Sequence, residues 1–261
     1  MKRLFVFGLG YTAARIAAAL EGGGWRVDAT GREGNFDFAD GPAVREALRE
    51  ATHCLSSVPP SEDGDPVLDR YGDALRGKWL AYLSSTGVYG DTKGAWVDES
   101  ASIGTGRRAI RAVCDARWLE AGARVFRLPG IYGPGRSALD RVRERKARRI
   151  DMPRQVFSRV HVEDIVSGVI AAIERDAPAG AYNLADDEPT SQNAVIEEAC
   201  RLVGAEAPRL QTLEEAGLSD AARGFYEENR RVANGKAKRV LGWRLQYPSY
   251  REGLSAIKAR E

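Results

Sequence analysis

The chain has 261 residues, enough to bury a full hydrophobic core in one large domain or in two tightly joined ones. Hydrophobic residues make up 43% of it and charged residues 29%, a balance that is typical of a soluble globular protein. The net charge is only +2, from 39 Lys and Arg against 37 Asp and Glu. No global charge therefore attracts nucleic acid or a membrane, and a small-molecule function is favoured.

Cysteine and histidine are scarce. Cys54, Cys114 and Cys200 lie far apart, and with only two histidines they form no metal-ligand spacing, so we expect no metal site. Unpaired, packed thiols are typical of a reducing compartment. The apolar run before Gly8 is four residues long, too short for a signal segment, and no stretch reaches the ~20 apolar residues of a membrane span. We expect a soluble, cytoplasmic protein without membrane association.

The first half of the chain alternates between apolar runs of strand length and helical patterns. Strands are expected at residues 4–7, 25–30, 53–58, 79–84 and 124–128. Helices are expected at residues 12–20, 42–50 and 107–120. Strands separated by helices favour right-handed βαβ units and a mostly parallel sheet.

The second half is less regular. A very basic helix is expected at residues 137–149, and a strand, a helix, a strand and a helix follow at 156–162, 164–174, 181–184 and 191–203. Residues 238–243 should close the C-terminal lobe, with Trp243 in its core. The fold class is therefore α/β, a doubly wound Rossmann sheet over residues 1–132, to which 155–185 return. A smaller substrate-binding lobe is expected over 133–261, with the site in the cleft between the lobes.

A glycine-rich turn follows the first strand. Gly8-Leu9-Gly10-Tyr11-Thr12-Ala13 fits the dinucleotide pattern G-x-G-x-x-A at the point where a strand ends and a helix opens. Gly8 permits the tight turn, and Gly10 lets the backbone approach a pyrophosphate. The free N–H groups and the dipole of the helix N-terminus, at Tyr11 and Thr12, would face that negative charge.

The end of the second strand distinguishes the two dinucleotides. An NAD site usually has an acid there for the ribose hydroxyls, but the strand ends near Thr30 and Gly31, and Asp28 lies too early. Arg32 is placed to meet a 2′-phosphate, which favours NADP over NAD as cofactor. The alternative for Arg32 is a solvated loop cation.

Several segments resemble the extended short-chain dehydrogenase/reductase superfamily, the NAD-dependent epimerase/dehydratase group. They occur in the family's order and at its usual spacings: Tyr82–Gly90, Arg127–Gly135, Arg159–Ile165, Tyr182–Leu184 and Lys238–Trp243. The resemblance covers nearly the whole chain. It implies that Ser57-Val58-Pro59, after the strand that begins at His53, lines the ribose and nicotinamide side of the cofactor, and that Pro129 and Ile131 meet the nicotinamide amide.

The resemblance also points to the substrate position. Ser85 takes the place of the family's substrate-polarising hydroxyl, because it stands three residues before Val88 as in the S/T-x-x-V-Y-G pattern. The substrate carbon would lie near Ser85 and Thr86. Tyr89 closes the same strand end and is a candidate proton donor, with Tyr132 as a second candidate.

The family's usual tyrosine and lysine are missing. The Y-x-x-x-K-x-x-x-E pattern falls on Arg107, Arg111 and Asp115, and a guanidinium cannot release a proton near neutral pH. Arg111 can still supply positive charge near the ribose. Tyr89 and Lys93 fit Y-x-x-x-K literally, but the glycines between and after them indicate a loop. The chain therefore resembles an atypical branch that keeps the fold and loses the active-site pair.

A basic segment and a histidine remain. Six cations crowd the segment after Gly135: Arg141, Arg143, Arg145, Lys146, Arg148 and Arg149. They either grip an anionic substrate or form a solvated face or oligomer contact, with a homodimer as one option. Without interleaved aromatic residues they do not predict nucleic-acid binding. For His161 we expect a hydrogen-bonded structural role.

Two main functions follow. The first is an NADP-dependent oxidoreductase or epimerase/dehydratase-like enzyme, with Ser85, Thr86, Tyr89 and Arg111 at its catalytic site. Its substrate would be small and polar, such as a nucleotide sugar or a phosphorylated compound. The second is a non-catalytic NADP-binding sensor or scaffold. A third reading is a structural protein whose basic helix binds another protein.

Overall fold

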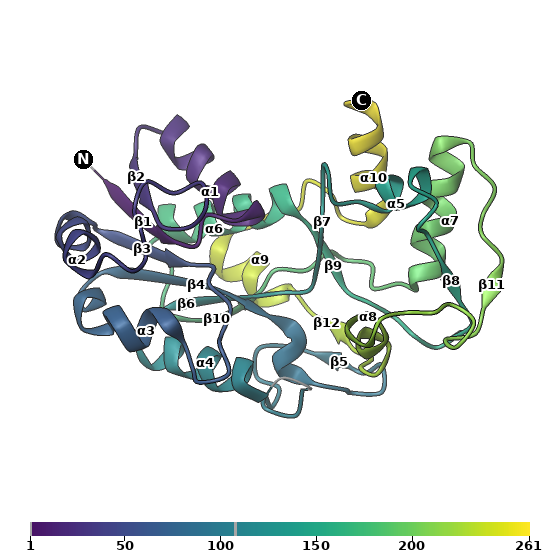
Figure 1. The fold of residues 1–261 in the computed structure, drawn as a ribbon, viewed down its shortest axis with the longest axis horizontal. Coiled ribbons are helices and arrows are strands. Elements are labelled where there is room, and N and C mark those ends of the chain that lie inside the picture. Colours follow the sequence, from purple (N-terminus) through teal and green to yellow (C-terminus); the bar gives the residue numbers. More distant parts are fainter. Residues whose placement is uncertain (1, 107–108) are drawn as a thin grey trace.

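A six-stranded parallel sheet forms the centre of the molecule. The structure is a computed structural model that describes residues 2–106 and 109–261. From one edge to the other the strands run β10-β6-β4-β3-β1-β2 (Figure 1). Their bounds are β1 (Arg3–Phe7), β2 (Arg26–Ala29), β3 (His53–Ser56), β4 (Trp79–Ser85), β6 (Arg124–Leu128) and β10 (Gly180–Asn183). The predicted doubly wound α/β fold is thus confirmed.

Helices cover both faces of the sheet, as Figure 1 shows. One face carries α1 (Tyr11–Gly22), α6 (Val162–Glu174) and α9 (Gly235–Leu241). The other carries α2 (Gly41–Glu50), α3 (Pro66–Tyr71), the short helix η1 (Gly72–Leu75) and α4 (Ala109–Glu120). Strand β1 lies between β2 and β3, so the chain first adds a strand on one side of β1 and then continues the sheet on its other side. At such a point a crevice opens at the carboxyl ends of the strands.

A smaller lobe follows the sheet. It is built from α5 (Ala138–Arg143), α7 (Gln192–Val203) and α10 (Tyr250–Ala259), which share a hydrophobic cluster. Short strand pairs join or flank the lobes: β7 (Gly130–Tyr132) with β9 (Arg159–His161), β8 (Arg149–Ile150) with β11 (Leu210–Gln211), and β5 (Trp96–Val97) with β12 (Arg231–Val232). The short helices η2 (Thr86–Tyr89), α8 (Asp220–Arg223) and η3 (Gly224–Tyr226) complete the described elements.

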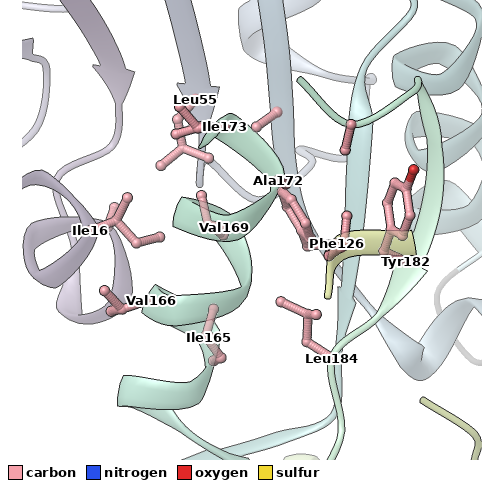
Figure 2. Close-up of a cluster of buried hydrophobic side chains, with 14 of the residues drawn as sticks. Ile16, Leu55, Phe126, Ile165, Val166, Val169, Ala172, Ile173, Tyr182 and Leu184 are labelled. Atoms are coloured by element: carbon pink, nitrogen blue, oxygen red, sulfur yellow. The ribbon is translucent and has the colours of Figure 1, made fainter. Parts of the chain in front are cut away.

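Helix α6 joins the two halves of the sheet into one core. Its buried residues face α1, β3, β6 and β10 (Figure 2). The labelled contacts include Ile16, Leu55, Phe126 and Leu184, each at most 1% exposed. Each fully buried aliphatic side chain contributes roughly 1.5–3 kcal/mol, so this helix fixes the β1–β3 end of the sheet relative to the β6–β10 end.

The outer strand of the usual Rossmann order is reduced to a bridge. Described residues 30–38 form no strand beyond β2, and only Thr30 and Phe36 pair as an isolated bridge. The rings of Phe36 and Phe38 instead pack against Phe5 and Phe7, and Tyr71 closes the cluster. Aromatic packing thus takes the place of a strand, and the loop after β2 stays close to β1.

The structure differs from the sequence-based expectations in three respects. The basic helix ends at Arg143, because Arg145 has a left-handed φ of 56° and the amides of Lys146 and Ala147 turn back to the carbonyl of Arg141. Residues 238–243 do not close the smaller lobe: Leu241 and Trp243 belong to the core cluster around α6. Helices α3, α8 and α10 were not predicted from the sequence.

The three cysteines are separate from one another in the structure. Cys54, Cys114 and Cys200 are all buried and unpaired. In the described part of the chain, no group of three or more His, Cys, Asp or Glu side chains is arranged to hold a metal ion. Among the same residues, no helix is both long and apolar enough to cross a membrane.

Candidate functional site

The glycine turn is held from two sides. Gly8 has a φ of +83°, and a Cβ there would lie 3.1 Å from the Val58 side chain and 3.2 Å from the Ser57 hydroxyl. Its amide donates to the Thr30 hydroxyl at 3.2 Å, and the Ser57 hydroxyl donates to the Gly8 carbonyl. The turn is therefore fixed between the ends of β2 and β3, and Gly8 is needed there for both its conformation and its lack of a side chain.

The N-terminus of α1 opens onto a cleft without a cap of its own. Gly10 is the N-cap residue, no side chain caps the helix, and the first turn contains no acid. The first backbone bond of the helix is from Ala14 to the Gly10 carbonyl, so the three preceding amides have no backbone acceptor among the described residues. A Cβ on Gly10 would meet nothing within 4 Å. Free N–H groups and an open approach are what a pyrophosphate requires.

This cleft, of about 860 Å³, collects most of the predicted site. It lies at the carboxyl edge of the sheet and extends towards α7 and α8 of the smaller lobe. Ten of the residues singled out in the sequence line it: Gly10, Tyr11, Thr12, Ser57, Pro59, Ser85, Thr86, Arg111, Pro129 and Ile131. Gly8 and Val58 lie directly behind this wall and shape the turn.

Ser85 is positioned to donate a hydrogen bond. It is the last residue of β4, and its hydroxyl oxygen accepts the Gly87 amide at 3.1 Å as the N-cap of η2. The hydroxyl hydrogen is then available for an acceptor in the cleft. Thr86 follows it and is almost fully buried. The close packing of residue 106 keeps η2 in place, because a Cβ on Gly106 would lie 2.1 Å from the Gly87 carbonyl oxygen.

A buried polar network lies behind Ser85. The Asp115 carboxylate accepts both the Nη2 and the Nε groups of Arg127, at 2.7 and 3.1 Å, and the Ser84 hydroxyl donates to it at 2.7 Å. Asp115 is 0% and Arg127 3% exposed. A paired and fully hydrogen-bonded charge is the form in which a buried ion is tolerated. The pair ties α4 to β6 and so fixes the helix one turn before it, where Arg111 lines the cleft.

Tyr89 belongs to this network and not to the cleft wall. Its hydroxyl donates to Asn183 Oδ1 at 2.8 Å and accepts from Arg127 Nη1 at 3.0 Å. The side chain is 2% exposed, and burial raises the pKa of the Tyr89 hydroxyl. These contacts correct the interpretation of Tyr89 as a stand-in proton donor. Its sequence alternative Tyr132 is also turned away, since it donates to the Ser249 carbonyl in the smaller lobe.

Two arginines stand at the positions where the family has its tyrosine and lysine. Arg107, which aligns with the family's tyrosine, lies outside the described residues. Arg111 aligns with the lysine and faces the cleft beside Ser84 and Ser85. It forms no ion pair or hydrogen bond with the described part of the chain, so its charge is directed at whatever fills the cleft.

The cleft is strongly cationic. Its described lining contains six arginines and a single carboxylate, Glu228, which pairs with Arg230 at 2.8 Å. The arginines come from separate parts of the chain: Arg111, Arg136, Arg141, Arg148, Arg159 and Arg230. Sequence reasoning missed Arg136, Arg159 and Arg230, because only the tertiary fold brings them together.

The basic segment is divided between two roles. Arg141 and Arg148 line the cleft. Arg143 pairs with Glu261, Lys146 with Glu144, and Arg149 with Glu197, which are surface contacts. The grip on an anionic substrate therefore stays a prediction for Arg141 and Arg148, whereas the other three cations form surface contacts.

Arg32 is exposed at the end of β2. It follows Gly31, whose hypothetical Cβ would lie 2.8 Å from the Leu9 amide, so the loop packs directly on the glycine turn. Asp28 is occupied elsewhere, because it accepts from the Asn35 side chain at 3.0 Å and pairs with Arg26.

His161 has the structural role that we expected. Its Nδ1 accepts the Glu163 amide at 3.2 Å and caps α6, and its ring packs between Tyr132 and Tyr247. Burial lowers the pKa of His161 to about 4, so the ring is neutral near pH 7 and can accept this bond.

Comparisons with known proteins agree with this geometry. No protein-family model matches the chain. A solved structure from Silicibacter pomeroyi, described as a functionally unknown conserved protein, is 39% identical and superposes with a TM-score of 0.87. The match covers 100% of this chain and 99% of that one. The chain belongs to the same family as that protein.

More distant solved structures define the fold class. The human epimerase family protein SDR39U1 (isoform2), solved with NADPH, has a TM-score of 0.81 at 14% identity and covers 99% of this chain and 100% of its own. The dTDP-glucose 4,6-dehydratase of Bacillus anthracis, solved in complex with NAD, has a TM-score of 0.78 at 15% identity and covers 99% and 96%. The fold is that of the NAD-dependent epimerases/dehydratases and extended short-chain dehydrogenases/reductases, as the sequence motifs predicted.

Two curated proteins are similar in sequence. The 3-diazoavenalumate denitrifying reductase of Streptomyces sp is 33% identical over 160 residues, which are 56% of this chain and 51% of that protein. The match thus spans about half the length of the reductase. Protein YeeZ of Escherichia coli (strain K12) is 22% identical over an alignment of 283 residues, covering 95% of this chain and 97% of that protein.

Proposed function

We propose that this family member binds NADP and reduces a small anionic substrate. One observation carries the proposal: a single cleft contains the uncapped N-terminus of α1, the hydroxyl of Ser85 and the unpaired charge of Arg111. The NADPH in the solved SDR39U1 structure and the reductase activity in the name of the Streptomyces relative support the same class of reaction.

The glycine turn fits the pyrophosphate of a dinucleotide. The three free amides at residues 11–13 point their partial positive charge into the cleft, and the missing Cβ of Gly10 leaves the approach open. Ser57 and Pro59 would then border the ribose, and Pro129 and Ile131 the nicotinamide, all four being part of the same wall. When bound, NADPH supplies a hydride with its electron pair.

The chain's own residues act on the substrate oxygen. Ser85 donates its free hydroxyl hydrogen to that oxygen and orients it. Arg111 stabilises the negative charge that develops there as the carbon accepts the hydride. Since the tyrosine position of the family is occupied by an arginine, we assign the final proton to solvent in the open cleft.

Replacing Gly10 tests the cofactor site. In Gly10→Ala the new Cβ enters open space, so the thermal stability of the free protein should change little. It blocks the pyrophosphate, so NADPH affinity should fall about ten-fold or more, equivalent to ~1.4 kcal/mol. Fluorescence titration with NADPH measures this. The matched control is Gly22→Ala at the other end of α1, where a Cβ also meets nothing within 4 Å. Equal affinity in both variants contradicts the proposal.

Arg32 tests the choice of dinucleotide. Its side chain is free to reach a 2′-phosphate at the turn, so Arg32→Ala should weaken NADPH binding and leave NADH binding nearly unchanged. Titration of the wild type and the variant with both cofactors measures the ratio of their affinities. An unchanged ratio, or a wild type that binds both equally, removes the assignment to NADP.

A non-catalytic NADP sensor is the second candidate. The burial of the Tyr89 hydroxyl favours it, because the cleft loses the proton donor nearest to Ser85. Steady NADPH oxidation with a panel of aldehydes, ketones and unsaturated acids, reduced strongly in Ser85→Ala, supports the reductase. An epimerase or dehydratase would convert its substrate without net NADPH oxidation. Tight NADPH binding without any conversion of substrate supports the sensor.

A further inference from the structure

We call the part of the cleft that lies beyond the proposed nicotinamide position the distal half. It is bounded by Phe157, Arg159, Gln192, Ile196, Phe225 and Tyr226. Phe225 is 63% exposed. The rings of Phe157 and Tyr226 meet edge to face at 5.5 Å, so one wall of the distal half is aromatic. Such walls pack well against a flat apolar group.

Arg159 is a buried cation held by neutral groups. It is 7% exposed, and its Nη1 donates to the carbonyls of Phe157 and Thr190 at 2.9 and 3.1 Å. Its Nη2 donates to Gln192 Oε1 at 3.0 Å. No carboxylate of the described residues lies within ion-pair distance of it. These bonds fix the plane of the guanidinium and leave Nε–H and one Nη2–H as donors that a carboxylate can accept.

The buried acid Asp186 does not form an ion pair with this charge. Its amide donates to the Arg159 carbonyl at 2.7 Å, but its carboxyl acts on the guanidinium only through space, and burial raises the pKa of the Asp186 carboxyl to about 8. At neutral pH most of this carboxyl is therefore protonated. An uncompensated buried cation is costly, and a bound anion removes that cost.

The distal half offers little to a sugar. Two of its neutral acceptors are already engaged, since Gln192 Oε1 accepts from Arg159 and Ser158 Oγ accepts the Val232 amide at 2.9 Å. Hydroxyl groups of a sugar need several such partners, whereas an apolar body needs the aromatic and aliphatic wall.

We propose that the distal half binds a carboxylate with a flat, apolar body, Arg159 receiving the carboxylate and Phe225 and Tyr226 packing against the body. This inference rests on the proposed function, because it names the substrate class of the same cleft. Its residues are distinct from those of the glycine turn, so the two proposals can fail separately.

Titration of the NADP⁺-loaded protein with trans-cinnamate tests the inference. Cinnamate should bind. Cinnamyl alcohol, which lacks the carboxylate, and acetate, which lacks the apolar body, should each bind at least about ten-fold more weakly. Tighter binding of phenyl phosphate than of cinnamate would show that the site prefers a phosphate ester to a carboxylate. Tighter binding of UDP-glucose than of cinnamate would show that it prefers a nucleotide sugar. Either result overturns the proposal.

Variants locate the binding. Arg159→Gln and Phe225→Ala should each weaken cinnamate about ten-fold, and Arg145→Ala, an exposed cation outside the cleft lining, should not. Far-UV circular dichroism and thermal unfolding of every variant show whether it is folded, and exposed Phe225 can be truncated without a cavity if Arg159→Gln fails that check. Unchanged cinnamate affinity in folded variants refutes the inference. Cinnamate binding without any NADPH binding refutes the proposed function alone.

Discussion

Asp115 and Arg127 form an ion pair that is almost wholly removed from solvent, next to the residue that we expect to orient the substrate. Each charge is stabilised mainly by the other, with Ser84 and Tyr89 satisfying what remains. Breaking such a pair by removing one charge costs roughly 3–5 kcal/mol, because the surviving charge stays buried. The pair is therefore a positioning element for Ser85 and Arg111 as well as a source of stability.

We predict that Asp115→Asn, which breaks this buried ion pair, lowers the free energy of unfolding by about 3 kcal/mol. Urea denaturation followed by tryptophan fluorescence measures the change. The control is Asp73→Asn, which breaks an exposed pair with Arg45 and should have little effect. A variant at residue 115 that is as stable as the control would show that the buried pair contributes no net stability.

Helix α6 is the element on which the two halves of the sheet depend. Its N-terminus is capped by His161, a residue that titrates, and burial lowers the pKa of this ring from 6.5 to about 4. Between these two values the unfolded chain takes up a proton and the folded protein does not. The contribution of His161 to the free energy of unfolding therefore decreases as the pH falls from 6.5 towards 4. The carboxyl of Asp164, whose pKa burial raises to about 6, contributes in the opposite direction.

We predict that His161→Asn, which keeps a side chain able to cap the helix, flattens this decrease. Denaturation curves at several pH values between 4.5 and 7.5 measure it. Part of the dependence should remain, because burial also lowers the pKa of His53 to about 4, and His53→Gln should remove that part. An identical pH profile in wild type and His161→Asn contradicts the lowered pKa of His161.

The distribution of charge becomes visible only for the whole molecule. The chain is nearly neutral, with a net charge of +2, yet six arginines and one glutamate line its cleft. Local positive potential of this kind attracts anionic ligands without binding nucleic acid over the rest of the surface. It also makes their binding depend on ionic strength, since the Debye length falls from about 10 Å at 0.1 M to about 3 Å at 1 M.

We therefore expect NADPH affinity to fall several-fold as NaCl rises over that range, measured by fluorescence titration. Arg148→Ala removes an exposed arginine of the cleft and should reduce the salt dependence. Arg145→Ala removes an arginine from the same segment that does not line the cleft, and should leave it unchanged. Equal slopes for both variants would show that the cleft charge does not act on the cofactor.

Local patterns in the sequence determined the fold. The strands at residues 3–7, 53–56 and 124–128 and the turn at Gly8 follow from apolar runs, glycine placement and alternation, all of which act between residues close in the chain. Ser57, Ser85, Arg111 and Pro129 could be identified because they stand at strand or helix ends, and parallel strands bring their carboxyl ends to one edge.

Only the tertiary structure shows which polar side chains face the cleft and which are buried, because contacts between distant residues decide this. Tyr89 stands at a strand end like Ser85, but Arg127 and Asn183, distant in sequence, turn its hydroxyl into the core. The distal half of the cleft collects Phe157 and Arg159, Gln192, and Phe225 from three separate segments, and no short-range pattern connects these segments. The sequence alone thus determined the scaffold and its glycine turn, whereas the direction of each polar side chain depended on partners that only the folded chain brings within hydrogen-bond distance.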